Sequence, residues 1–135
     1  MRTLRVVIAL SLLLIGLGYT VADSALPPSK AIEIVISKRT FSPAVTTLGA
    51  GKPVMLVFRN EDEDLHAFVP LLLFLKVNVQ VSGNGAPQFN ETGFARVLIP
   101  PHGRAELRFT PTTPGTFSYI CDLPGHNMRG EIIVQ

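Results

Sequence analysis

The chain has 135 residues, enough for one domain, and 47% of them are hydrophobic, which is enough to form a buried core. Twelve basic and ten acidic residues give a formal net charge of +2. Residues 23–135 contain no cluster of Lys or Arg, so the composition excludes nucleic-acid binding as a class of function.

The first 22 residues are predicted to form an export signal. Arg2 and Arg5 precede an apolar run from Val6 to Ala22, and small residues stand just before the predicted cleavage after Ala22. Cleavage would leave ten basic and ten acidic residues, so the mature chain would carry no formal net charge. The apolar run of 17 residues is at the short end of what spans a bilayer, so an uncleaved membrane anchor is the alternative. We expect an exported protein, periplasmic or otherwise extracytoplasmic, whose only membrane contact is this segment.

Residues 23–30 are rich in Pro and Ser and are predicted to be a linker, and residues 31–135 a single domain. Several segments of this domain alternate between apolar and polar residues, which predicts half-buried β-strands. The apolar positions that share a face are Ile32, Ile34 and Ile36, then Val54, Leu56 and Phe58, and then Ala105, Leu107 and Phe109.

Clusters of turn residues separate these segments. They are "LGAGKP", "RNEDED", "SGNGAP", "IPPHG" and "TPTTPG". Gly permits positive φ, and Pro fixes φ and removes a hydrogen-bond donor, so both interrupt strands. No segment after the signal shows a sustained helical period. About seven or eight short strands at this spacing predict an all-β fold, a Greek-key β-sandwich or barrel.

The stretch from Pro70 to Phe94 does not fit the strand pattern. It begins with a continuous apolar run, Leu71 to Leu75, and ends in polar, Gly-containing sequence. We favour a strand buried on both faces for this run, and an exposed apolar surface for a partner is the alternative.

The segment "CDLPGHNM", residues 121–128, contains the only cysteine of the chain together with His126 and Met128. Phe117, Tyr119 and Cys121 have the same parity, so the inward face of a predicted strand continues into Cys121. The chain then turns at Pro-Gly and returns as the strand "RGEIIV". Cys121, His126 and Met128 are therefore predicted to lie on one tight hairpin loop, where their side chains can converge on a metal.

The types of these side chains indicate the metal. Thiolate and thioether are soft donors, and two His with one Cys and a weak axial Met is a ligand set for copper. The second histidine is predicted to be His66, in "FRNEDEDLHAFVP", which follows a strand and an acidic turn. A lone cysteine excludes an internal disulfide, whereas an inert buried thiol or an intermolecular disulfide remains an alternative.

Residues 31–135 resemble the cupredoxins, the small blue copper proteins such as plastocyanin, azurin and amicyanin. The resemblance is carried by "FSPAVTTLGAGKPVMLVFRNEDEDLHAFVP", "IPPHGRAELRFTPTTPGTFSYICDLPGH" and "MRGEIIV". It implies that His66, Cys121, His126 and Met128 bind one copper ion, with Asn60 and Phe68 matching the family pattern around the first histidine. The sequence departs from the family pattern in one place. Only Asn127 lies between His126 and Met128, whereas the family usually has more than one residue between these two ligands.

Three other sites are disfavoured by the same residues. A binuclear copper centre needs two cysteines, and a structural zinc site normally uses more cysteines than one. A cysteine hydrolase would use Cys121 and His126, but no sequence resembling an oxyanion loop accompanies them. His102 stands in a Pro-Gly turn and is predicted to be an exposed loop residue.

The resemblance implies an electron carrier and not an enzyme. Its redox partner would be a cytochrome or an oxidase or reductase, and electrons would leave through the edge of His126, beside Leu123 and Pro124. The acidic turn from Glu61 to Asp64 would steer a basic partner or would simply be solvated. The alternatives are copper delivery, storage or sensing, or a copper relay subunit docked to a membrane redox complex through Leu71 to Leu75.

Overall fold

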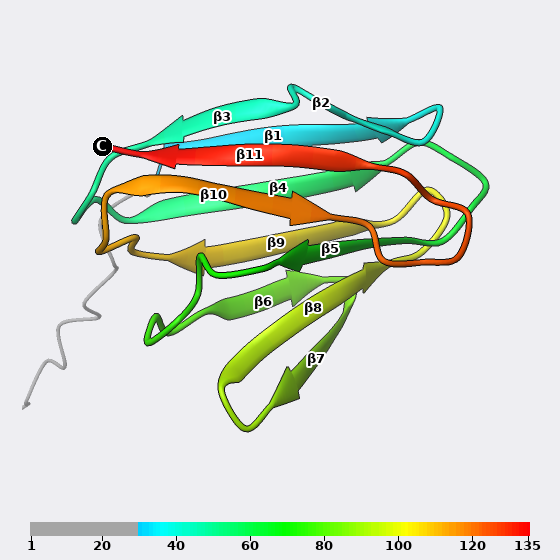
Figure 1. Ribbon diagram of the computed structural model, residues 1–135. Helices are drawn as coiled ribbons and strands as arrows, with labels where there is room; N and C mark the ends of the chain where they lie inside the picture. The colour runs from blue at the N-terminus through cyan, green and yellow to red at the C-terminus, as the bar shows by residue number, and fades with distance from the viewer. Residues whose placement is uncertain (1–29) are drawn as a thin grey trace, which may run out of the picture.

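The computed structural model describes residues 30–135, so the predicted export signal and most of the predicted linker lie outside the described residues. Over this range the chain forms eleven β-strands in two sheets that pack face to face (Figure 1). The described residues contain no helix, and so none with the length and apolarity needed to cross a membrane. The predicted all-β Greek-key sandwich is confirmed.

The two sheets are mixed. The first has the order β2-β1-β4-β9-β6 and the second the order β3-β11-β10-β5-β8-β7. β1 pairs in parallel with β4, and β3 with β11, whereas the other neighbours are antiparallel. The strands are β1 (Lys30–Ser37), β2 (Thr40–Ser42), β3 (Val45–Leu48), β4 (Val54–Asn60), β5 (His66–Pro70), β6 (Gln80–Gly83), β7 (Ala86–Asn90), β8 (Gly93–Ile99), β9 (Arg104–Phe109), β10 (Gly115–Ile120) and β11 (Arg129–Val134).

The core lies between the sheets and is built from the alternating positions. The predicted inward residues of β4 and β9 are all buried, and in β1 Ile34 and Ile36 are buried while Ile32 is half-buried. Aromatic rings join the two layers, with Phe58 of β4 lying 4.3 Å from Phe68 of β5 between ring centroids. Each such side chain contributes about 1.5–3 kcal/mol on burial. Close packing of these side chains restricts movement of the scaffold beneath the loops.

The chain has more strands than the sequence indicates. The additional ones include β2, β3, β6 and β7, which are three to five residues long. Over so few residues, alternation cannot be separated from an irregular pattern, and β7 is exposed along its whole length.

The prediction of a doubly buried strand at residues 71–75 is wrong. β5 ends at Pro70, and residues 71–76 form successive turns in which the N–H of Leu75 donates to the carbonyl of Leu72 at 3.3 Å. Leu73 and Phe74 are buried by these turns, whereas Leu71, Leu72 and Leu75 remain 54%, 61% and 55% exposed. In successive turns, some neighbouring side chains point toward the core and others toward solvent. A continuous apolar run in the sequence does not show which of its side chains will be buried.

β10 and β5 pair over only two residues each. Tyr119 pairs with Pro70 and Ile120 with Val69, and the ladder stops one residue before Cys121. Beyond that point the backbone N–H of Ala67 donates to the sulfur of Cys121 at 3.3 Å, in place of a backbone carbonyl. The two strands therefore separate at one end of the sandwich, where the start of β5 and the end of β10 lie (Figure 1).

The hairpin of β10 and β11 is packed tightly next to the loop that joins its two strands. Gly130 pairs with Tyr119, and the fully buried Tyr119 ring lies over the glycine so closely that a Cβ atom would overlap it. Glycine is required here by this close approach of ring and backbone. The hairpin thus holds the loop that joins its two strands in a fixed position.

Candidate metal centre

His66 is the first residue of β5, in the middle of its sheet. It pairs with Ile99 of β8, and its side chain is fully buried. Its Nδ1 atom lies 3.2 Å from Nδ1 of His126, a residue 60 positions further along the chain. The sheet therefore fixes His66 with one ring nitrogen directed at the loop after β10.

Cys121 follows the last residue of β10 and keeps the inward direction of Tyr119. Its side chain is buried, and its sulfur lies 3.4 Å from Nδ1 of His126. The next residue, Asp122, is held by two bonds from Nη1 of Arg96 on β8, at 2.8 and 2.7 Å. This ion pair fixes the chain where it leaves the strand.

His126 lies in a tight turn. Its N–H donates to the carbonyl of Leu123 at 3.0 Å, with Pro124 and Gly125 in between, and Gly125 has a φ of 80°. Pro followed by Gly with positive φ is the pattern of a type II turn. The N–H of Cys121 donates to the carbonyl of Met128 at 3.2 Å and closes the loop. His126 is thereby turned back toward Cys121 while its ring remains half-exposed.

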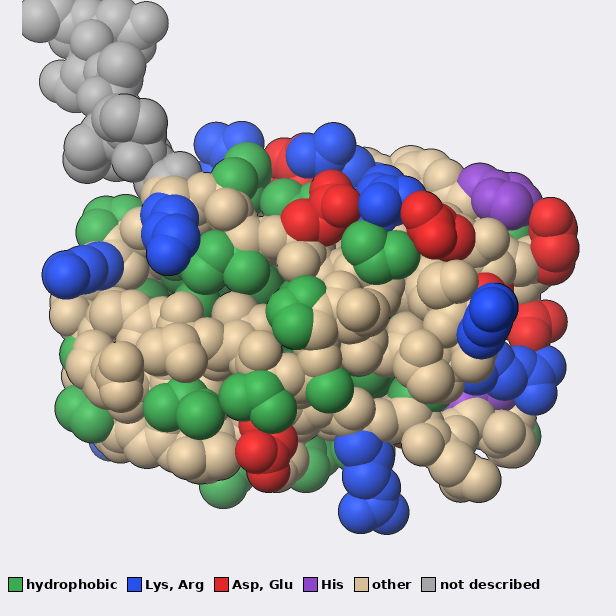
Figure 2. Space-filling view, turned by 90° about the horizontal axis from the view of Figure 1, so that it is seen from above, with side chains coloured by type: hydrophobic (Ala, Val, Ile, Leu, Met, Phe, Trp, Pro, Cys, Tyr) green, Lys and Arg blue, Asp and Glu red, His purple; other side chains and the backbone are tan. Residues whose placement is uncertain are grey.

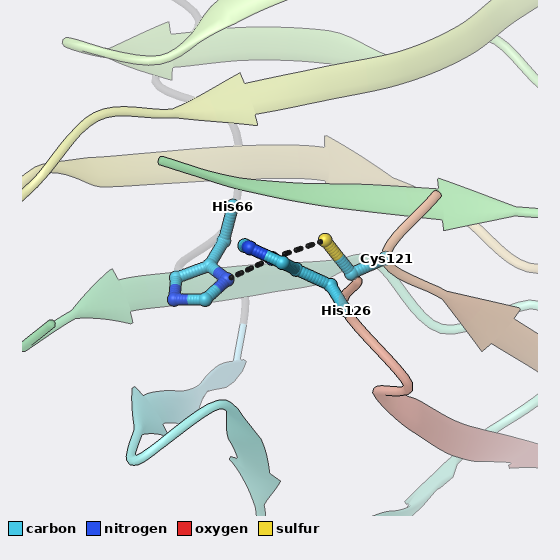
Figure 3. Close-up of side chains that lie close together, drawn as sticks. All are labelled: His66, Cys121 and His126. Atoms are coloured by element: carbon cyan, nitrogen blue, oxygen red, sulfur yellow. Dashed lines mark hydrogen bonds between the residues drawn. The ribbon is translucent and has the colours of Figure 1, made fainter. Parts of the chain in front are cut away.

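The three side chains converge on one point. The nitrogen or sulfur donors of His66, Cys121 and His126 all lie within 4.8 Å of one another, and they point toward each other in Figure 3. Two nitrogens that are each about 2.0 Å from a tetrahedral metal lie about 3.3 Å apart, close to the separation of the two Nδ1 atoms. The arrangement therefore fits a single metal ion held by two imidazoles and a thiolate.

Asp62 supports His66 from the opposite side of the ring. One of its carboxylate oxygens lies 2.9 Å from Nε2 of His66. Burial lowers the pKa of His66 below its ordinary value, and Asp62, which acts in the opposite direction, does not restore it. His66 is therefore neutral at neutral pH, and neutral imidazole is the form that binds metals.

Asn60 organises the acidic loop between β4 and β5. It is 1% exposed, and its Nδ2 donates to the carbonyls of Asp64, Ile99 and Pro100 at 2.8, 3.2 and 2.9 Å. Its Oδ1 accepts from the N–H of Asp62 at 2.9 Å. One buried amide thus joins the loop that carries Asp62 to the end of β8.

Met128 and His102 lie in different surroundings. Met128 is 2% exposed and directly precedes β11, where its carbonyl bonds to Cys121. His102 is exposed, as expected, and its Nε2 lies 2.8 Å from Glu63. The group of three converging donors does not include His102.

The sequence reasoning missed two contacts to the site. It treated the acidic turn as a surface feature and did not single out Asp62. It also could not anticipate the N–H of Ala67 on the sulfur of Cys121. The contact between Asp62 and His66 could have been suspected from the sequence, because an acid stands four residues before the histidine. However, Asp62 is one of four acids in that turn, and only the loop geometry distinguishes it from the others.

Two of the four carboxylates in the acidic turn pair with arginines of the same chain, and the other two contact histidines. Each of its carboxylates contacts a basic or histidine side chain, in the pairs Glu61–Arg59, Asp62–His66, Glu63–His102 and Asp64–Arg39. Figure 2 accordingly shows acidic, basic and histidine side chains interspersed at the right-hand end of the molecule. Internal pairing reduces the negative field that this turn would offer to a basic partner.

Comparison with known proteins places the chain in a family. Residues 7–134 match the model of a family described as "Cupredoxin-like domain". The chain belongs to this family. The copper-resistant cuproprotein CopI of Pseudomonas aeruginosa is similar to this cupredoxin, with 23% identity over 152 residues that cover 89% of this chain and 84% of CopI.

Two solved structures share the fold of this cupredoxin. Auracyanin A, described as a "blue" copper protein from the green thermophilic photosynthetic bacterium Chloroflexus aurantiacus, has a TM-score of 0.59 and 21% identity, covering 80% of this chain and 100% of its own. Dithionite-reduced auracyanin from Roseiflexus castenholzii has a TM-score of 0.58 and 22% identity, covering 79% and 98%. The family and the converging donor set together identify copper as the cofactor of this chain.

We predict that Asn60→Ala lowers the free energy of unfolding of the copper-free protein by about 1–3 kcal/mol, because it leaves buried carbonyl groups without their donor. Urea denaturation measures this change. The matched control is Asn84→Ala, which removes an exposed amide whose Oδ1 accepts from the N–H of Arg104, and which should cost under about 1 kcal/mol. Equal costs for the two variants would show that Asn60 does not organise the loop.

Proposed function

We propose that this cupredoxin is an exported, mononuclear blue copper protein that transfers single electrons between redox partners and does not turn over a substrate. His66, Cys121 and His126 would hold the copper ion, and Met128 would be a fourth, weaker ligand. The observation that carries the proposal is the convergence of two imidazole nitrogens and one thiol sulfur at the end of a stiff sandwich. Bound copper would supply a one-electron couple between Cu(I) and Cu(II).

The surrounding residues keep the donors in place during electron transfer. His66 and Cys121 are 0% and 3% exposed, so neighbouring side chains restrict their movement. The N–H of Ala67 donates to the sulfur of Cys121 and so holds the sulfur at the site. A site whose ligands move little on oxidation and reduction needs little reorganisation for each electron.

His126 provides the route from the site to the surface. It is the only one of the three converging donors that is not buried, and it lies on the loop between Cys121 and Met128. Leu123 is half-buried and Pro124 exposed on the same loop, so apolar side chains would contribute to the surface near the ring. Electrons would enter and leave through the edge of this ring when a partner covers the surface.

The partner would be a cytochrome, or an oxidase or reductase, in the periplasm or another extracytoplasmic space. Because two of the four acids in this turn pair with arginines of the same chain, the turn would shape the site more than it would steer a basic partner. Contact through the surface near His126 would then contribute most of the recognition.

A role in copper handling is the second candidate. It is favoured by the likeness to CopI, whose name describes a copper-resistant cuproprotein. Residues 23–135 contain only two methionines, Met55 and Met128, whereas exchangeable copper sites of delivery proteins are often rich in Met or His. This composition favours the electron carrier.

A carrier should retain its metal while it cycles between oxidation states. We predict that the copper-loaded protein shows reversible one-electron voltammetry and keeps one copper per chain after repeated cycles, because buried ligands restrict exchange. Metal analysis after cycling, in the presence of a competing copper chelator, measures retention. Loss of copper to the chelator on reduction would instead support a delivery or storage protein.

We predict that Met128→Leu raises the reduction potential, because loss of a thioether donor destabilises Cu(II) more than Cu(I). A tenfold change in the relative affinity for the two states corresponds to about 59 mV. Met55→Leu is the matched control, since Met55 lies half-buried within β4, and it should leave the potential unchanged. The same potential in both variants would mean that Met128 serves only as a core residue.

A further inference from the structure

Both carboxylate oxygens of Asp62 have hydrogen-bond partners within the protein. Oδ1 accepts from the N–H of Lys38 at 2.7 Å, and Oδ2 accepts from the N–H of Arg39 at 2.9 Å and lies 2.9 Å from Nε2 of His66. Partial burial alone would raise the pKa of Asp62, but the hydrogen bonds from Arg39, Lys38 and His66 outweigh it and lower that pKa. The backbone N–H groups can only donate, so both oxygens of Asp62 act as acceptors, which is the arrangement of an ionised carboxylate.

The turn that provides these N–H groups is itself unusual. Lys38 and Arg39 connect β1 to β2, and both have positive φ angles, 52° and 55°. Two such residues form a tight hairpin turn, and this backbone costs about 1–2 kcal/mol per residue other than Gly. The two hydrogen bonds to Asp62 offset that cost. The carboxylate is consequently held in one place by the backbone and does not depend on the ring for its position.

An ionised carboxylate can only accept hydrogen bonds. With an oxygen 2.9 Å away, Nε2 of His66 must carry the hydrogen, and in a neutral ring Nδ1 is then left with a free lone pair. Nδ1 is the atom that faces His126 and the converging donors. The hydrogen bond from the ring to Asp62 therefore selects the tautomer that binds a metal at this site.

We propose that Asp62 is a positioning residue of the metal centre, which holds His66 with its hydrogen on Nε2 and, through its negative charge, makes Nδ1 a stronger donor toward Cu(II). This inference rests on the proposed role of His66 as a ligand. Carboxylate partners raise the basicity of histidine ligands, and their loss typically costs about 10–100-fold in metal affinity. A stronger donor favours the more highly charged Cu(II) and so lowers the reduction potential.

The neighbouring acids do not share this arrangement. Glu63 is 88% exposed and contacts His102, and Asp64 pairs with Arg39 on the surface. Asp62 alone in this turn contacts the ring of His66. Glu63→Gln therefore removes the same charge one residue away without touching the site, and it is a matched control for Asp62→Asn.

The first test uses the wild-type protein without copper and needs no variant. Long-range ¹H–¹⁵N correlation spectra at neutral pH assign the hydrogen of the His66 ring to one nitrogen. We expect Nε2 to be protonated and Nδ1 to be unprotonated. A majority of the opposite tautomer would overturn the inference, and this result does not depend on whether the protein is an electron carrier.

The second test measures Cu(II) affinity and reduction potential in Asp62→Asn and Glu63→Gln. We expect Asp62→Asn to bind Cu(II) about tenfold more weakly and to show a higher potential, and Glu63→Gln to match the wild type. Equal potentials in the two variants, with copper retained, would overturn the role of Asp62 while leaving the proposed function intact. Should Asp62→Asn fail to fold because the turn at Lys38 opens, the tautomer in the wild-type protein still decides the question.

Discussion

The separation of β5 from β10 is the constraint on which the site depends. The two strands pair at only two positions, and their ladder ends one residue before Cys121. If the ladder continued, the N–H of Ala67 would have to bond to a backbone carbonyl, and the sulfur of Cys121 would lack its donor. Because the strands separate, a thiol and a histidine can both be buried between them, and the Pro-Gly turn brings His126 to the same place.

A second layer of polar contacts makes this opening rigid. Asn60 joins the acidic loop to the end of β8, and Asp62 joins His66 to the turn between β1 and β2. Arg96 holds Asp122 next to Cys121. Buried polar groups destabilise a fold when they lack partners and specify one arrangement when all partners are present. The site is therefore organised by the protein before any metal binds.

The sequence predicted the elements whose patterns are local. Strict alternation identified β1, β4 and β9, and the parity of Tyr119 and Cys121 correctly placed the cysteine on the inward side. His66 was proposed from its place after a strand and an acidic turn, and the resemblance to a family supported the choice. The alternating pattern alone could not place it beside Cys121, because that proximity arises from contacts between residues far apart in the chain. The features that the sequence did not predict depend on backbone geometry. The turns at residues 71–76 and the choice of Asp62 among four acids depend on φ angles and loop closure, which side-chain patterns do not encode.

The central claim is that His66, Cys121 and His126 together hold one copper ion, and the visible absorption spectrum of the oxidised, copper-loaded protein tests it most directly. The account predicts an intense charge-transfer band from the sulfur of Cys121, which is lost in Cys121→Ser and His66→Ala and kept in His102→Ala. A colourless Cu(II) complex would contradict the account. The same conclusion would follow from a preparation that takes up zinc in the presence of copper, or from a band that survives His66→Ala but not His102→Ala.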